Sequence, residues 1–289
     1  MTFVHSFQVE PMLQSKFRNL DKGLKITLVD YAYSVECIHK FGHTIELYTD
    51  TVGAEILKPI PYDKVHIVTN DITKNWNFAA SIKFKALQNM TLDQILIDGD
   101  IFLEKPIVFT LLQNFNSDMV VSMYEPRERI FNVETMNETI SVCSKFQQPN
   151  YELPNAENML GWYNTSLLKF NNEALKSEYI RQYIAHVKQS ENFEFKAYIW
   201  PDIVYEQYNI EALLKNTNCS LEMVNPYYNI DESYAYKIGF CHLGVSKEIS
   251  HMYYLRMLQN LNYQLSLDLQ DHYIYLMEDF IPKLIVLNT

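Results

Sequence analysis

Glycine and cysteine are both scarce in this chain. Only 7 of its 289 residues are glycine, and no segment has the composition of a flexible linker, so we expect a single domain over residues 1–289. The cysteines are too widely separated to form a C-x-x-C pair, which argues against a zinc knuckle or a thiol redox motif. We expect reduced thiols, as in a cytosolic protein, at Cys37, Cys143, Cys219 and Cys241.

The chain also lacks basic runs and long apolar runs. Its 24 Lys and Arg residues are outnumbered by 35 Asp and Glu residues, giving a formal net charge of −11. This balance argues against nucleic acid as a partner and weakens binding to anionic lipid. No apolar run is long enough to span a bilayer, and the first residues, MTFVHSFQVEP, lack the features of a signal peptide. We therefore expect a soluble, cytoplasmic protein.

Short apolar runs alternate with segments of helical periodicity. Strands separated by helices of this length predict an α/β fold, with a Rossmann-like, mostly parallel sheet flanked by helices. The predicted strands are 2–7, 44–48, 64–69, 94–97, 119–123 and 163–170, and the predicted helices are 24–41, 52–57, 78–90, 106–115, 172–188 and 202–215. Residues 125–157 have weak periodicity and are expected to form an irregular insertion, whereas the portion from about 245 is expected to be helical.

An acidic pair follows the strand predicted at 94–97. Asp98 and Asp100 flank Gly99, and two carboxylates so spaced on an extended backbone point to the same side. Ligands of such sheets bind beyond the carboxyl ends of the strands. Because Mg²⁺ and Mn²⁺ prefer oxygen ligands and bridge carboxylates to phosphates, the pair predicts a cation beside a diphosphate, with Gly99 keeping the approach open. The pattern is short, and a surface turn is the alternative.

A second group of polar residues lies near the end of the chain. His242, Gly244 and Lys247 place an imidazole, a small residue and a cation within six positions. The histidine can complete a metal site, and the lysine can hold a diphosphate as a point charge. A structural histidine beside a helix start is the alternative for His242.

Four segments together resemble glycosyltransferases of the GT-A fold. Asp98 to Asp100 resembles their D-x-D motif, and residues 162–171 resemble a strand that follows it in these enzymes. Residues 201–207, PDIVYEQ, resemble the "DQ" helix of glycosyltransferase family 8, and His242 to Lys247 resembles that family's C-terminal H-x-x-G-x-x-K motif. The four segments occur in the family's order. Ser166 and Glu206 depart from the family 8 pattern, which has glycine and aspartate at these positions. The chain therefore resembles a small related bacterial GT-A family equally well.

The resemblance implies a set of ligand contacts. Asp98, Asp100 and His242 would bind Mn²⁺ or Mg²⁺, and Gly244 and Lys247 would contact the diphosphate of a nucleotide sugar. The end of the first strand, His5 and Ser6, lies where the nucleobase and ribose bind in these enzymes, although His5 is equally a candidate structural histidine. Lys83 lies where they place a basic residue that approaches the donor, and a solvated helix face is the alternative.

The resemblance also implies catalytic roles for Glu206, Gln207 and Asn164. In a retaining enzyme Gln207 would lie near the anomeric carbon and Glu206 would hold sugar hydroxyls. In an inverting enzyme Glu206 or Asp202 would deprotonate the acceptor hydroxyl. Asn164 would hydrogen-bond donor or acceptor sugar. The alternatives are ordinary exposed acids on a helix and a turn residue at a strand end.

These features predict a metal-dependent glycosyltransferase of the hexosyltransferase type. Its donor would be a nucleotide sugar, UDP-linked on family grounds, and its acceptor a hydroxyl of a glycan or glycolipid, such as a cell-surface polysaccharide precursor. The apolar C-terminal segment 265–289 is expected to dock on its own domain, with a second subunit or a membrane-bound acceptor complex as alternatives.

Two other classes of protein remain as alternatives. One class of metal-dependent phosphohydrolase also has a D-x-D motif in its site. Its motif lies on the first strand and is followed shortly by a residue with a hydroxyl group, which Ile101 to Leu103 does not supply. A degenerate GT-A domain that binds sugar without catalysis is the third interpretation.

Overall fold

The computed structural model describes residues 1–9, 20–73, 75, 78–126, 133–146, 161–196, 201–226, 232–242 and 251–283. Seven strands form one sheet in the order β3-β2-β1-β4-β7-β6-β8. They are β1 (Thr2–Phe7), β2 (Thr44–Thr49), β3 (Lys64–Ile67), β4 (Gln94–Ile97), β6 (Met119–Pro126), β7 (Gly161–Phe170) and β8 (Leu221–Asn225). All neighbours pair in parallel except β7, which is antiparallel to both β4 and β6. The predicted α/β class with a mostly parallel sheet is confirmed.

The central strands are apolar because both of their faces are covered. In β1, Phe3 and Phe7 pack into one hydrophobic cluster and Val4 packs into another. The same alternation occurs in β4, where Ile95 and Leu96 belong to different clusters. Burial on both faces produces the nearly continuous apolar runs that a parallel sheet requires.

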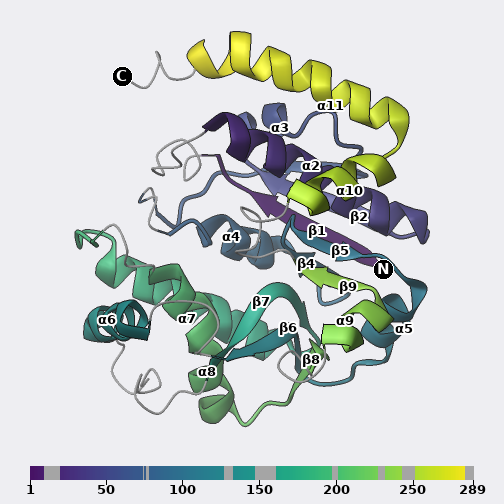
Figure 1. Ribbon diagram of the computed structural model, residues 1–289. Coiled ribbons are helices and arrows are strands. Elements are labelled where there is room, and N and C mark those ends of the chain that lie inside the picture. The colour runs from purple at the N-terminus through teal and green to yellow at the C-terminus, as the bar shows by residue number, and fades with distance from the viewer. Residues whose placement is uncertain are drawn as a thin grey trace.

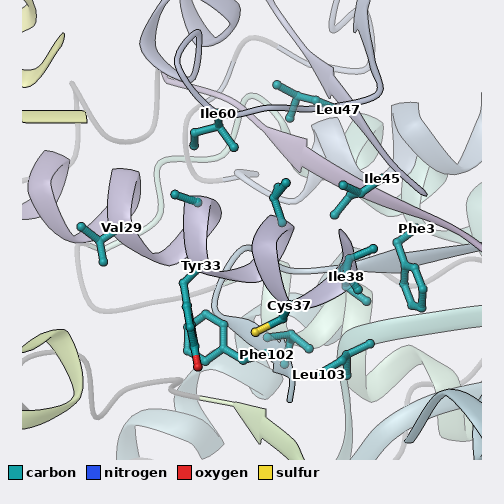
Figure 2. Packing of buried hydrophobic residues seen from close by; sticks show 14 of the residues in the cluster. Phe3, Val29, Tyr33, Cys37, Ile38, Ile45, Leu47, Ile60, Phe102 and Leu103 are labelled. Carbon is teal, nitrogen blue, oxygen red and sulfur yellow. The ribbon is translucent and has the colours of Figure 1, made fainter. Parts of the chain in front are cut away.

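Helices cover the two faces (Figure 1). One face carries α2 (Leu20–Lys40), α10 (His251–Asn260) and α11 (Tyr263–Tyr275), and the other carries α4 (Ser81–Asn89), α7 (Glu173–Ser190) and α8 (Asn209–Thr217). Figure 2 shows the first cluster, in which α2 packs between strand residues such as Ile45 and the residues Phe102 and Leu103. The described residues also include α3 (Thr51–Ile56), α5 (Pro106–Asn114), α6 (Val133–Cys143) and α9 (Glu232–Ile238), with π-helices η4 (Ile203–Tyr208) and η6 (Leu276–Phe280).

A small second sheet joins distant parts of the chain. Strand β5 (Ile101–Leu103) pairs antiparallel with β9 (Phe240–His242), and Ile101 lies opposite His242. The sequence did not predict either strand, since each has only three residues. This pairing brings the C-terminal histidine next to the acidic pair that precedes β5.

Each predicted strand and helix is present in the structure, with ends that differ by a few residues. The interpretation of 125–157 as an irregular insertion is wrong in part, because α6 and a short 3-10 helix, Ser144–Phe146, lie within it. Strand β8 was not predicted either, since its LEMVN sequence is too polar for an apolar run. In the described part of the chain, no helix has the length and apolarity required to cross a membrane.

Candidate active site

The acidic pair lies where the sequence predicted it, beyond the carboxyl end of β4. The Asp98 amide donates to the Ser166 carbonyl at 2.7 Å, and the Ile101 amide donates to the Asp98 carbonyl at 3.1 Å. These bonds fix the backbone turn between β4 and β5. The strand directions place the carboxyl ends of β1, β4 and β6 and the amino end of β7 at this same edge.

Lys83, Asp98 and Glu206 form an ion-pair network at this edge. The Lys83 Nζ atom lies 2.6 Å from Glu206 Oε1 and 2.9 Å from Asp98 Oδ1. Thr165 donates its hydroxyl to the same Glu206 oxygen at 2.5 Å. Lys83 is only 7% exposed and Glu206 only 5%, so the alternatives of a solvated helix face and of an ordinary exposed acid are wrong.

The two carboxylates determine the charge state of Lys83. Burial acts to lower the pKa of its ammonium group, but Asp98 and then Glu206 outweigh burial and raise that pKa well above its usual range. Burial raises the pKa of Asp98, and Asp100 and Glu206 add to this effect while Lys83 opposes it. The two carboxylates thus favour the charged form of Lys83 inside an acidic site.

Asp100 faces His242 on the neighbouring strand. Asp100 is 6% exposed, and its Oδ2 atom lies 3.8 Å from Nε2 of His242. Adjacent ligand atoms on an octahedral cation with bonds of about 2.1 Å lie about 3.0 Å apart, so these two atoms would have to approach each other by somewhat less than about 1 Å to share one divalent ion. One oxygen of Asp98 is held by Lys83, and within the described ranges no three His, Cys, Asp or Glu side chains form a ready metal-binding group. Among the described residues, Asp100 and His242 are therefore the side chains closest to a shared position for a cation.

Gly99 is in contact with Tyr31 of α2. A Cβ atom on Gly99 would lie 2.2 Å from the Tyr31 ring, and the Tyr31 hydroxyl donates to the Ser6 carbonyl at 3.0 Å. The absence of a side chain at Gly99 therefore admits the tyrosine ring, which links the acidic pair to the end of β1.

Gly99→Ala is expected to lower the free energy of unfolding by about 1–3 kcal/mol, because the added methyl group overlaps the Tyr31 ring. Gly23→Ala is the matched control, since no atom lies within 4 Å of the corresponding position on α2. Helix propensity predicts that this control gains about 0.5–1 kcal/mol. Urea denaturation of both variants checks the prediction, and equal effects would contradict the contact.

His5 is enclosed by the protein. It is 0% exposed, and its ring nitrogens lie 2.9 Å from the Tyr62 hydroxyl and 3.1 Å from the Ser34 hydroxyl. Burial lowers the pKa of His5 to about 3, although Asp100 opposes this shift. The ring is therefore neutral, and a nucleotide could reach its nitrogens only if one of these hydrogen bonds broke.

Asn164 and Glu125 form a second buried polar group at the same edge. The Asn164 side chain accepts hydrogen bonds from the Ser122 hydroxyl at 2.7 Å and the Ser166 amide at 2.9 Å, within an irregular part of the β6–β7 pairing. Trp162 Nε1 donates to Glu125 Oε2 at 3.0 Å. Burial raises the pKa of Glu125, while His242 and the hydrogen bonds from Asn164 and Trp162 act against it.

Glu125 is not among the site residues that the sequence predicts, because it falls in the segment interpreted as an insertion. The available signal was its place directly after the apolar strand predicted at 119–123, the same position that identified Asp98 after β4. Asn164 lies inside β7, so the alternative of a turn residue at a strand end is wrong.

Glu206 and Gln207 lie on a π-helix, η4 (Ile203–Tyr208), which runs directly into α8. Glu206 is buried, and Gln207 is half-buried one position along the helix. The Tyr179 hydroxyl donates to the Glu206 carbonyl at 3.1 Å. Short π-helical segments occur frequently at functional sites, and here the segment carries Glu206 of the ion-pair network.

Asp202, just before η4, is held by two hydrogen bonds. The Ala80 amide donates to one carboxylate oxygen at 2.9 Å, and the Tyr183 hydroxyl donates to the other at 2.7 Å. Burial nevertheless raises the pKa of Asp202 to about 7, although these two bonds lower it. The alternative of an exposed acid is therefore wrong for Asp202 as well.

Asp202 is expected to make folding pH-dependent. Its folded pKa of about 7 lies above the unfolded value near 3.8, so the stabilising protonation is complete below about pH 3.8 and is lost as the pH rises through 7. Wild type should therefore lose this stability as the pH rises from 4 to 8, whereas Asp202→Asn should not. The free energy of unfolding of Asp202→Asn should rise relative to that of wild type across this range. The hydrogen bond to Lys85 lowers the pKa of Asp71, so Asp71→Asn should show no such gain. Urea titrations across this range measure both, and a parallel response would contradict the assignment.

Gly244 and Lys247 lie outside the described residues, so their predicted contacts with a diphosphate stay predictions.

Residues 1–280 match the model of a protein family described as a family of unknown function (DUF6734). No curated protein matches the chain. Among solved structures, an active-site mutant of LgtC is 10% identical, with coverage of 91% of this chain and 96% of that chain and a TM-score of 0.44. The bifunctional glycosyltransferase WbbM is 9% identical, with coverage of 94% of this chain and 51% of that chain and a TM-score of 0.47. The glycosyltransferase GlyE of Streptococcus pneumoniae TIGR4 is 13% identical, with coverage of 88% of this chain and 51% of that chain and a TM-score of 0.37.

Proposed function

The chain belongs to the family of unknown function DUF6734, and we propose that it is a GT-A glycosyltransferase. It would move a sugar from a nucleotide-sugar donor, UDP-linked, to a hydroxyl of a glycan or glycolipid. One observation carries this proposal: residues from five segments of the chain meet at one edge of the sheet. Lys83, Asp98, Thr165 and Glu206 share one ion-pair network, and His242 lies beside Asp100.

A divalent cation, Mn²⁺ or Mg²⁺, would be held by Asp100 and His242, with Asp98 beside it. When bound, it would neutralise the charge of the departing nucleoside diphosphate. The two donor atoms are 3.8 Å apart, which supports this assignment because a small side-chain movement would bring both within reach of one cation. His242 is half-buried, so the pair keeps a side open to a ligand.

Lys83 would stabilise the arrangement of acids rather than bind the donor directly. Its ammonium group is nearly enclosed and already contacts two carboxylates. It therefore holds Asp98 and Glu206 close together despite their like charge. Thr165, on strand β7, orients Glu206 through its hydroxyl group.

Glu206 and Gln207 would act on the transferred sugar. Glu206 is the side chain that the network orients, and Gln207, the next residue of η4, is accessible to a ligand. In this assignment Glu206 accepts a hydrogen bond from a sugar hydroxyl, and Gln207 lies near the anomeric carbon. Asn164 would orient Glu125 and the edge of β7, because its side chain is engaged by Ser122 and Ser166.

The test is a calorimetric titration of the wild-type chain with UDP, GDP and CDP, with and without Mn²⁺, followed by UDP-sugar turnover assays. The transferase is supported if one nucleotide binds in a metal-dependent way and if UDP is released from a UDP-sugar during turnover. Binding without turnover supports the degenerate sugar-binding domain. Hydrolysis of a phosphate monoester such as p-nitrophenyl phosphate, with no nucleotide binding, supports the phosphohydrolase.

A further inference from the structure

A second cavity lies along α2, away from the carboxylates of the candidate active site. Its volume is about 550 Å³, which is within the range of small-molecule pockets. None of its lining residues belongs to the Lys83 network or to the Asp100–His242 pair. The walls come from α2, from Pro61, from the residue after β5 and from the junction of α10 and α11.

The floor of this cavity is formed by Tyr33 and Cys37, which lie one turn apart on α2 and are both buried. Figure 2 shows them projecting from α2 toward Phe102. The Tyr33 hydroxyl donates to Glu104 Oε1 at 2.9 Å. Burial, reinforced by Glu104, raises the pKa of the Cys37 thiol to about 12, so the thiol is neutral. The floor thus offers an aromatic ring, a hydroxyl and an uncharged thiol.

Two carboxylates line the walls, and each is held in place by a neighbour. Glu36 accepts the Asn262 backbone amide with both oxygens, at 3.1 and 2.9 Å. Glu104 accepts the Arg256 guanidinium at 3.2 and 3.3 Å. Because a carboxylate has about four acceptor positions, both groups keep capacity for a ligand in a fixed orientation.

The charges around the cavity are nearly balanced. Lys40 lines the cavity, Arg256 pairs with Glu104 beside it, and these cations offset the two carboxylates. His39 lies 2.9 Å from Asp63, which is not among the residues that line the cavity. A balanced set of donors and acceptors favours an uncharged ligand, since an anion such as a nucleoside diphosphate would meet both carboxylates.

We propose that this cavity binds an uncharged, hydroxyl-rich ligand, a mono- or disaccharide unit, at a site separate from the nucleotide site. Carboxylates accept from sugar hydroxyls, the Lys40 ammonium and the side chains of Asn260 and Asn262 at the rim provide polar partners, and Tyr33 supplies an aromatic surface. The sugar comes either from free saccharide or from one unit of a longer glycan. Binding here requires neither a metal nor Asp100.

The test uses saturation-transfer NMR with the full chain and a panel of glucose, galactose, mannose, lactose, maltose and maltotetraose. Asn260→Trp places a large ring at the rim, because Asn260 is the exposed last residue of α10. Asn114→Trp is the matched control at the exposed last residue of α5, outside the cavity. We expect Asn260→Trp to weaken sugar binding at least tenfold, whereas Asn114→Trp and Asp100→Asn leave it unchanged.

Each outcome is decisive. Retained binding of maltotetraose together with the shorter sugars identifies a unit of a longer glycan, and binding of the short sugars alone identifies free saccharide. No saturation transfer from any panel member to wild type, or equal binding by Asn260→Trp and wild type, overturns the proposal. Loss of sugar binding in Asp100→Asn would also overturn it, because the sugar would then occupy the nucleotide site. A chain that binds sugar but no nucleotide would contradict the proposed transferase while leaving this site intact.

Discussion

Asp100→Asn is expected to abolish metal-dependent binding of the nucleotide and to lower turnover by about 10²–10³-fold. Asp100 is buried beside His242, and these two side chains are the proposed ligands of the cation. Asparagine keeps the shape of the side chain but removes the charge that a divalent cation requires. Calorimetry with UDP and Mn²⁺ measures binding, and release of UDP from a UDP-sugar measures turnover.

Asp71→Asn is the control for this experiment. Asp71 is an exposed acid that pairs with Lys85 of α4, and its loss changes the net charge equally. Its nucleotide binding should match wild type. Circular dichroism melting verifies that both variants are folded. Unchanged metal-dependent binding in folded Asp100→Asn would remove Asp100 from the metal site.

Lys83→Met is expected to lower the free energy of unfolding by about 3–5 kcal/mol, because it leaves two carboxylates without their shared cation. The cost comes mainly from Glu206, whose side chain is 7% exposed, whereas Asp98 is 36% exposed and regains part of its hydration. Turnover should fall as well, since Glu206 loses the group that orients it. Urea denaturation and the UDP-sugar assay measure the two effects.

The neighbouring Lys85 provides the matched control on the same helix. Its ammonium group pairs with exposed Asp71, so Lys85→Met should cost only about 0–1 kcal/mol. The double variant Lys83→Met/Glu206→Gln should recover part of the lost stability, because the unpaired buried charge is removed with its partner. Equal destabilisation by the Lys83 and Lys85 variants, or no recovery in the double variant, would mean that the network contributes nothing measurable.

Much of the fold was predictable because buried strands and helices require local patterns of apolar residues in the sequence. Strands β1 and β4 are apolar on both faces, and α5 begins with Pro106 at a position where its missing amide costs nothing. Strands β5 and β9 are too short to show such a pattern. Each has three residues, and they exist because Ile101 and His242 pair across more than 130 positions of sequence.

The candidate site divides in the same way. The Asp98–Asp100 pair could be identified from its place after an apolar strand, and Glu125 carries the same signal after β6. The surroundings of Lys83 could not be predicted, because the helical pattern around α4 does not specify which element covers each face. Strand β7 and helix η4 cover the face that carries Lys83, and this burial turns a nominally exposed lysine into the centre of an ion-pair network.

The sequence by itself determined the α/β class, the order of the central strands and helices along the chain, and the position of the acidic pair at a strand end. Each of these depends on residues a few positions apart, whose periodicity reflects local burial. Only the tertiary structure decided that Asp98 pairs with Lys83, that His242 reaches Asp100, and that His5 is enclosed between Tyr62 and Ser34. Those contacts join residues that are distant in sequence, and their geometry follows from strand pairing and helix packing.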